Sequence, residues 1–168
     1  MRTIYYLLVA GLLAALGACS GSSEPMAVQI TGPLGPPTDP AVVTGQAAEE
    51  GIVCDAAMFE ELYFVDLDGK ILTEEEANQL KQVEMETGEI VFSAKYDKWS
   101  CTDGSGYFVM AGTGTLPPAA YDFEGINEVA TWTVDSGTGD YEKLSGTGSI
   151  EVDFARGTVT YIGELEKG

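Results

Sequence analysis

Three segments near the end of the chain alternate between apolar and polar residues: 128–134, 149–154 and 158–166. A period of two places every second side chain on the same face of a β-strand. One face then lies in the core and the other in water, which is typical of antiparallel sheets. Because short connections such as 155–157 join consecutive strands, the pattern predicts a meander.

A meander of about eight strands removes its exposed edges by closing into a barrel. We therefore predict a mostly all-β fold, a small antiparallel eight-stranded barrel, with a two-sheet β-sandwich as the alternative. Trp132, Phe154 and Tyr161 fall on inward faces of the predicted strands and are expected to form core, with a ligand cage as the alternative. A barrel of this size is either filled by side chains or holds one small ligand.

One helix interrupts the strands. The sequence Thr73-Glu74-Glu75-Glu76 fits a capping box, which starts a helix. Ala77, Leu80 and Val83 give that helix an apolar stripe to about residue 85, and Thr87-Gly88 ends it. Before it, the β-rich segments 52–54 and 62–67 are followed by Asp68-Gly69, which predicts a two-residue hairpin turn.

The same region has the spacing of a calcium loop. With Gly69 as the sixth position, Asp66 is third, Asp68 fifth and Glu75 twelfth. The first position, normally Asp, is Phe64, and no entry helix precedes it. The alternative is a hairpin turn followed by a capped helix, so Asp66, Asp68 and Glu75 are candidate calcium ligands only.

The N-terminus has the parts of a secretory signal. Arg2 precedes a short apolar run from Ile4 to Leu16, and small residues follow. The ending Leu16-Gly17-Ala18-Cys19 resembles a bacterial lipobox, which implies that residues 1–18 are removed and that Cys19 carries a lipid. A plain secretory signal is the alternative. Ser20 follows the cysteine where inner-membrane retention signals have Asp, which implies an outer-membrane location in a Gram-negative cell.

Residues 19–50 read as a tether rich in Pro, Gly and Ser, which would leave 51–168 as the barrel domain. Within that segment, A-V-Q-I at 27–30 is either a short strand or part of the tether. Removing residues 1–18 removes one arginine and no acid, so seven basic and 27 acidic side chains remain. Such an acidic surface argues against nucleic acid and anionic lipid as partners. The predicted contact with the membrane is therefore through the lipid.

Cys54 and Cys101 remain once Cys19 is assigned to the lipid. In an exported chain an even pair of cysteines predicts a disulfide. Two free thiols are the alternative.

Four glycines, Gly137, Gly139, Gly146 and Gly148, lie between two strands in the stretch SGTGDYEKLSGTG. A phosphate loop does not fit, because its second glycine is absent, and a dinucleotide fingerprint does not fit, because Glu142 stands where its third glycine should be. We expect instead that Gly137 and Gly139 adopt positive φ at a turn, and that Gly146 and Gly148 allow close approach or a bulge. Tyr141 and Leu144 are expected to cover the barrel end.

The run from Trp132 to Gly148, W-x-V-x-x-G-T-G-x-Y-x-x-L-x-G-x-G, resembles a signature of secreted bacterial proteins in the allene oxide cyclase-like barrel group. That group is similar to plant dirigent proteins. Residues 101–106, C-T-D-G-S-G, resemble a turn in the same bacterial proteins. The resemblance covers roughly residues 99–166 and implies an eight-stranded, calycin-like barrel. It implies no activity, and no catalytic residue is transferred by it.

The chain has no histidine, which removes serine–histidine and cysteine–histidine catalysis and most zinc sites. With no catalytic motif found, we expect a lipid-anchored envelope protein of binding or scaffold type, and no cofactor. One alternative is a cyclase- or dirigent-like barrel enzyme that steers a small apolar ligand. The other is a calcium-dependent interaction module. An open apolar cavity would favour ligand binding.

Overall fold

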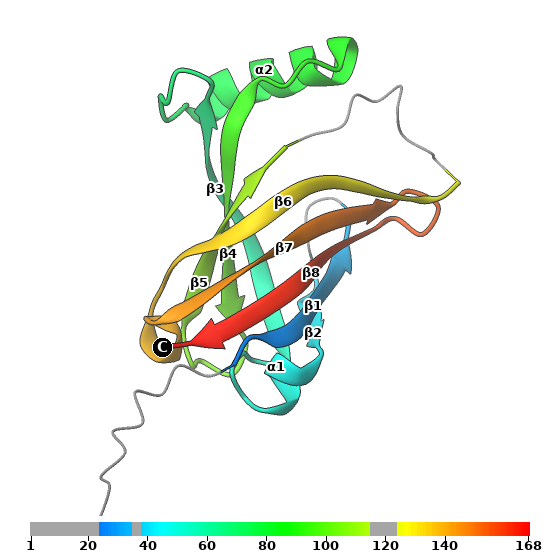
Figure 1. The fold of residues 1–168 in the computed structure, drawn as a ribbon. Coiled ribbons are helices and arrows are strands. Elements are labelled where there is room, and N and C mark those ends of the chain that lie inside the picture. The colour runs from blue at the N-terminus through cyan, green and yellow to red at the C-terminus, as the bar shows by residue number, and fades with distance from the viewer. Residues whose placement is uncertain (1–23, 35–37, 115–123) are drawn as a thin grey trace, which may run out of the picture.

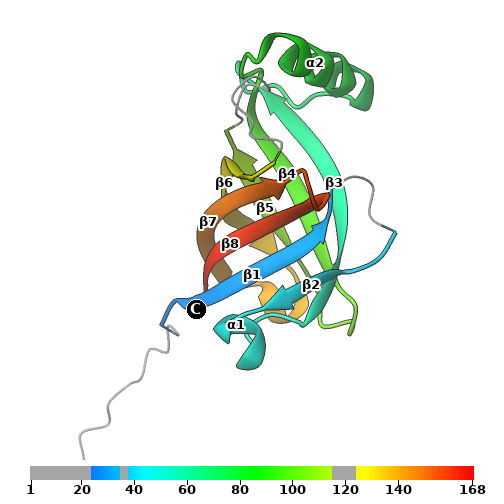
Figure 2. The same ribbon diagram turned by 90° about the vertical axis from the view of Figure 1, so that its right-hand side faces the viewer.

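The computed structural model of the chain describes residues 24–34, 38–114 and 124–168. Its strands form one closed antiparallel barrel in the order β1 to β8 (Figures 1 and 2). The strands are β1 (Met26–Pro33), β2 (Ala41–Thr44), β3 (Ala56–Asp66), β4 (Phe92–Cys101), β5 (Tyr107–Thr113), β6 (Ile126–Gly137), β7 (Leu144–Asp153) and β8 (Thr158–Lys167). The helices are α1 (Gln46–Glu49), α2 (Glu74–Thr87) and the short 3-10 helix η2 (Gly139–Tyr141). The first strand pairs with the last, which confirms the barrel over the sandwich.

The barrel begins earlier than the sequence predicted. Strands β1 and β2 lie within the segment 19–50, so assigning all of that segment to a tether and starting the domain at 51 is wrong. The physical reason is burial: Val28 and Ile30 face the core in a short alternation, and the Pro/Gly-rich residues connect β1 to β2. Residues 52–54, predicted to be β-rich, form a turn and no strand.

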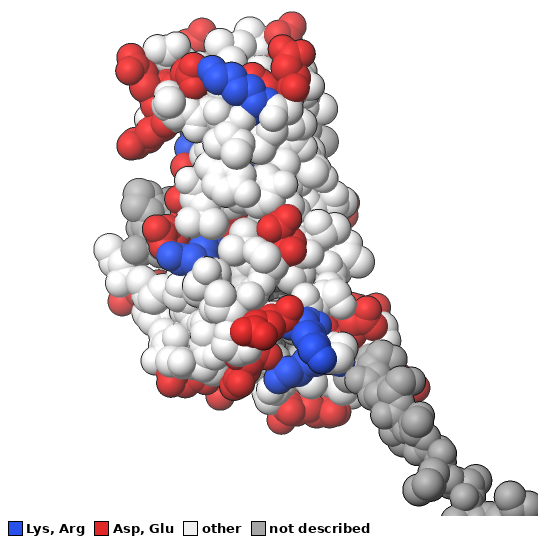
Figure 3. All heavy atoms as spheres, turned by 90° about the vertical axis from the view of Figure 1, so that its left-hand side faces the viewer, with Lys and Arg blue, Asp and Glu red and all other residues white. Residues whose placement is uncertain are grey.

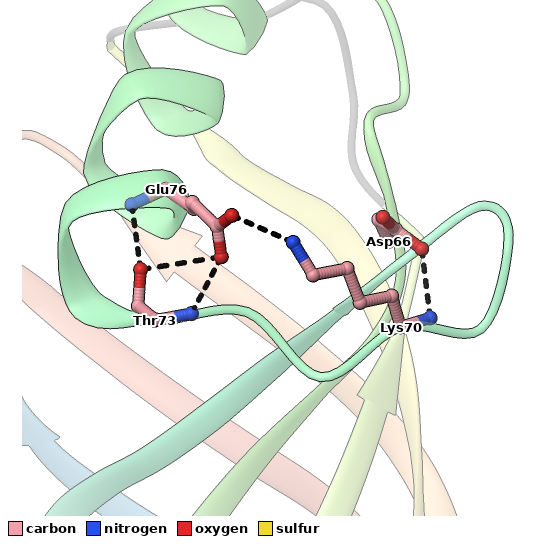
Figure 4. Close-up of polar contacts among 4 residues, drawn as sticks. All are labelled: Asp66, Lys70, Thr73 and Glu76. Carbon is pink, nitrogen blue, oxygen red and sulfur yellow. Dashed lines mark hydrogen bonds and ion pairs between the residues drawn. The ribbon is translucent and has the colours of Figure 1, made fainter.

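The predicted helix is confirmed as α2, at the end of the molecule away from the C-terminus (Figure 1). Its N-cap Thr73 and Glu76 form the capping box drawn in Figure 4. Gly88 ends it in the left-handed conformation. The hydrogen bond from Lys70 and that from the Thr73 amide lower the pKa of Glu76 to about 2.

The apolar stripe of α2 is narrower than predicted. Ala77 is buried against Phe64 and Phe92, and Leu80 is half-buried. Val83, however, is 38% exposed. The helix therefore rests on the extended part of β3 and β4 through a small apolar cluster, apart from the main core.

The turn before α2 has three residues, not the two that were predicted. Gly69 donates its N–H to the Asp66 carbonyl, and the Asp66 N–H bonds the Lys70 carbonyl. Gly69 has φ +83°, as expected for glycine at the last position of a three-residue hairpin loop. The returning chain makes a single bridge, Val65 to Ile71, before it enters the helix.

Side chains fill the end of the barrel near η2. Trp132, Phe108, Met110, Leu165 and Ile30 are fully buried there and in the central core. The Trp132 indole lies on two glycines, Gly148 and Gly163, that are paired across β7 and β8. A Cβ atom at Gly148 or Gly163 would lie 2.7 Å or 2.6 Å from the indole ring. Phe154 is not an inward strand residue as predicted, because β7 ends at Asp153 and Phe154 lies half-buried in the following turn.

The glycine-rich stretch closes this end as the sequence predicted. Tyr141 and Leu144 are buried in the main core cluster. Gly139 has φ +61°, so its expected conformation is confirmed. Gly137 does not have positive φ, and that expectation is wrong. Glycine is needed there for space, because a Cβ atom would lie 2.1 Å from the Tyr141 carbonyl oxygen.

Gly146 and Gly148 allow the close approach that was expected of them. A Cβ atom at Gly146 would lie 2.4 Å from the Glu164 carbonyl oxygen, and one at Gly148 would lie 2.0 Å from the Ile162 carbonyl oxygen. The predicted disulfide between Cys54 and Cys101 is present, with the Cα atoms 5.9 Å apart. It ties the chain before β3 to the end of β4.

Candidate functional site: a lateral pocket in the barrel wall

A short strand opens the barrel wall between β1 and β3. β2 makes two residue pairs with β3, at Ala57 and Ala56, and three with β1. Pro40 directly precedes β2, and proline has no N–H to donate to a sheet ladder. Among the described residues, β3 from Met58 to Tyr63 has paired neighbours on the β4 side only. Figure 2 shows β1, β2 and β3 on this side of the molecule.

A cavity of about 550 Å³ lies at this opening. That volume falls within the range of small-molecule sites. The lining comes from strands β1, β2, β3, β4 and β8, from the residue after β1 and from α2: Gly32, Pro33, Leu34, Ala41, Phe59, Glu60, Glu61, Lys81, Trp99, Val159 and Tyr161. Most of these side chains are apolar, so the cavity suits an apolar molecule.

Three aromatic rings form one wall of the pocket. Phe59 and Trp99 meet edge to face with centroids 5.2 Å apart, and Trp99 and Tyr161 do so at 5.0 Å. Trp99 is only 1% exposed, and its indole Nε1–H has no hydrogen-bond partner among the described residues. A buried donor without a partner costs about 1–3 kcal/mol.

A buried carboxyl lies behind this wall. The Tyr161 hydroxyl donates a 3.0 Å hydrogen bond to Oδ2 of Asp97, which is 7% exposed. Burial raises the pKa of Asp97 to about 6, and the bond from Tyr161 only partly opposes this. Burial and the nearby Asp97 also raise the pKa of Tyr161 well above its usual value. At neutral pH Asp97 is therefore mostly ionised and Tyr161 is neutral.

Two ion pairs hold the rim. Lys81 of α2 lies 2.7 Å from Glu61 and also 4.1 Å from the Phe64 ring centroid. Lys98 pairs with Glu60. Among the side chains of α2 that the structure describes, Lys81 is the one that lines the pocket, so it links the helix to the mouth.

The predicted calcium ligands are not gathered into a site. Oδ1 of Asp66 accepts hydrogen bonds from the amides of Asp68 and Lys70, which orders the hairpin turn (Figure 4). Glu75 lies in the first turn of α2. In the described parts of the chain, no group of three or more His, Cys, Asp or Glu side chains is placed to hold a metal ion.

Cys19 and the predicted signal segment lie outside the described residues. Within the residues that are described, none of the helices has the length and apolar character needed to cross a bilayer.

Sequence reasoning missed Asp97 and favoured core over a ligand cage for Tyr161, which is both buried and part of the pocket lining. The sequence pattern that could have indicated Asp97 lies in β4, where Asp97 shares the buried face of the strand with Trp99 and Cys101. An acid in phase with two core residues is unusual, since unpaired carboxyl groups are rarely buried. The long mixed segment 89–101 obscured this alternation.

Fold and site together define a closed eight-stranded barrel with a lateral apolar pocket beside a buried acid. Comparison of the chain with protein-family models, with curated proteins and with solved structures finds no match. The architecture is the one that the resemblance to allene oxide cyclase-like proteins implies, and membership of that group stays a prediction.

Proposed function

We propose that this protein binds a small, largely apolar molecule in the lateral pocket of its barrel. The observation that carries the proposal is the cavity of about 550 Å³ with an apolar lining and a few polar groups. The side chains of Glu60, Glu61 and Lys81 at the rim supply polar groups of the kind that orient a ligand.

A neutral fluorescent dye, N-phenylnaphthylamine, tests this proposal. We expect saturable binding with one dye per chain. Val159→Phe fills the pocket from β8 and should weaken binding about tenfold or more, since overlap with a ring excludes the dye. Val42→Phe adds the same ring at a position that is 58% exposed and away from the lining, and should leave binding unchanged. Equal affinity in both variants, with both folded by melting temperature, would overturn the proposal.

A barrel enzyme of the cyclase or dirigent kind is the second candidate. The observation that favours it is Asp97, because an acid with a pKa of about 6 can exchange protons near neutral pH. Small molecules extracted from wild-type and Asp97→Asn protein made in the same host separate the two functions. If the protein is an enzyme, the wild type would carry product and Asp97→Asn would carry unreacted substrate. A binding protein would carry the same molecule in both.

We further propose that a lipid on Cys19 anchors the barrel to the cell envelope. The lipobox-like sequence at Leu16–Cys19 supports this. Mass spectrometry of the protein made in a bacterial host should show loss of residues 1–18 and addition of acyl chains. Cys19→Ser should abolish the addition. Cleavage at another residue, with Cys19 unmodified, would support the plain secretory signal.

A further inference from the structure

Of the carboxylates around the lateral pocket, some are paired with a lysine and one is not. Three carboxylates surround it: Glu60 and Glu61 at the rim, and Asp97 behind the aromatic wall. The two rim acids are each paired with a lysine, Lys98 and Lys81. In the described part of the chain, Asp97 has no lysine or arginine nitrogen within 4.0 Å. The carboxylate closest to the interior is therefore the one without a cation.

Asp97 is enclosed by lining residues of the pocket. Tyr161 from β8 donates to it, Glu61 is its register partner on β3, and Trp99 follows two residues later on the same face of β4. The other charged groups acting on it are Lys95 of β4 and Lys81 of α2. Lys95 lies 4.0 Å from Glu84 and Lys81 lies 2.7 Å from Glu61, so both ammonium groups already have acidic partners.

The field of the whole molecule acts in the same direction. The chain carries a formal net charge of −19. Figure 3 shows acidic side chains at the ends and in the middle of one face, with basic side chains among them at several places. Such a charge attracts cations and repels anions during encounter. At close range, the faces of aromatic rings such as Trp99 and Tyr161 also attract ammonium groups.

We propose that the lateral pocket selects its ligand by charge, taking an apolar molecule that carries an ammonium group in preference to neutral or anionic molecules of the same shape. This inference rests on the proposed binding function. The apolar body lies against Phe59, Trp99 and Val159. The ammonium group lies at the Tyr161 side of the cavity, where it offsets the unpaired charge of Asp97.

Three compounds that carry their substituent at the same position of the naphthalene ring test the charge preference: naphthylmethylammonium, naphthylmethanol and naphthoate. Calorimetry on the purified full chain at about pH 8, where Asp97 is ionised, should show the ammonium compound binding about tenfold more tightly than the alcohol. Naphthoate should bind most weakly. At about pH 5, where Asp97 is mostly protonated, the advantage of the ammonium compound over the alcohol should largely disappear.

The Asp97→Asn variant keeps the shape and an acceptor for Tyr161 but removes the charge. It should bind the alcohol as the wild type does and lose the preference for the ammonium compound at both pH values. A preference that survives in Asp97→Asn, equal affinities for alcohol and ammonium compound, or tightest binding of naphthoate would each overturn the inference. If the neutral dye still binds in those cases, the proposed function stands. If the dye fails as well, both fall.

Discussion

Tyr161 on β8 and Asp97 on β4 meet across the interior of the barrel, with the phenol hydroxyl 3.0 Å from the carboxylate. This hydrogen bond lies beside the lateral pocket, because Tyr161 also forms part of the pocket lining. The bond satisfies one oxygen of a carboxylate that is otherwise buried without a cation. Such a carboxylate lowers the free energy of unfolding at neutral pH. A buried acid of this kind beside a cavity is typical of a functional site.

Replacing Asp97 with Asn should stabilise the protein in a pH-dependent way. The pKa of Asp97 rises from 3.8 to about 6 on folding. Between about pH 4 and about pH 6, the Asp97 carboxyl is therefore protonated in more of the folded molecules than of the unfolded ones. The contribution of Asp97 to stability therefore falls as pH rises from about 4 to about 6 and then stays constant. The difference at neutral pH is about 3 kcal/mol.

Denaturant unfolding of both proteins across this pH range measures the effect. We expect Asp97→Asn to be more stable at about pH 8 and the difference to shrink toward about pH 4. A difference that does not change with pH would show that the carboxyl titrates normally in the folded protein.

Gly139→Ala should destabilise the barrel more than Gly69→Ala. Both glycines have positive φ, which costs a residue with a Cβ atom about 1–2 kcal/mol. At Gly139 the new Cβ would also lie 2.3 Å from the Ser105 carbonyl oxygen, whereas nothing lies within 4 Å at Gly69. The difference between the two melting temperatures isolates the contact. Equal losses would show that η2 moves freely.

Removing the Cys54–Cys101 disulfide should lower stability by about 4 kcal/mol on chain-entropy grounds, since the cysteines are 47 residues apart. The double variant Cys54→Ala/Cys101→Ala, compared with the wild type under reducing and oxidising conditions, measures this. Reduction should lower the free energy of unfolding of the wild type and leave that of the double variant unchanged. A wild type that is insensitive to full reduction would contradict the prediction.

Lys81→Met should loosen α2 without unfolding the barrel. The change removes the ion pair with Glu61 and the contact of the ammonium group with the Phe64 ring. Together these are worth about 1 kcal/mol, so amide exchange in α2 should speed up roughly fivefold. Lys70→Met removes an exposed ion pair with Glu76 and serves as the control, with little change expected. Equal amide protection of α2 in the two variants would show that the contacts of Lys81 with Glu61 and Phe64 do not hold the helix in place.

The C-terminal half of the barrel was predictable because its alternation is regular and its glycines are tightly constrained. The capping box at Thr73 and Glu76 likewise located α2 to within a residue at its start. Strand β2 was missed, and residues 27–30 of β1 were left open between strand and tether, because both strands flank a segment rich in Pro and Gly. A local pattern rule assigns such a segment to a linker, although the pairing of β1 with β8 makes it part of the barrel.

The lateral pocket was not predictable from local patterns. Its lining comes from five strands, from the residue after β1 and from α2, and it lies where the short strand β2, which begins only at Ala41, leaves β3 unpaired. Only the closed topology brings Phe59, Trp99 and Tyr161 together. The acid behind them, Asp97, is in phase with Trp99 and Cys101, but the mixed segment 89–101 hid this signal among 27 acidic residues.

A crystal structure of the full chain soaked with naphthylmethylammonium tests the central claim most directly. We predict density for the ring between β1 and β3, against Trp99 and Tyr161, with the ammonium group toward Asp97. An empty lateral pocket, at a ligand concentration that saturates the protein in solution, would contradict the account.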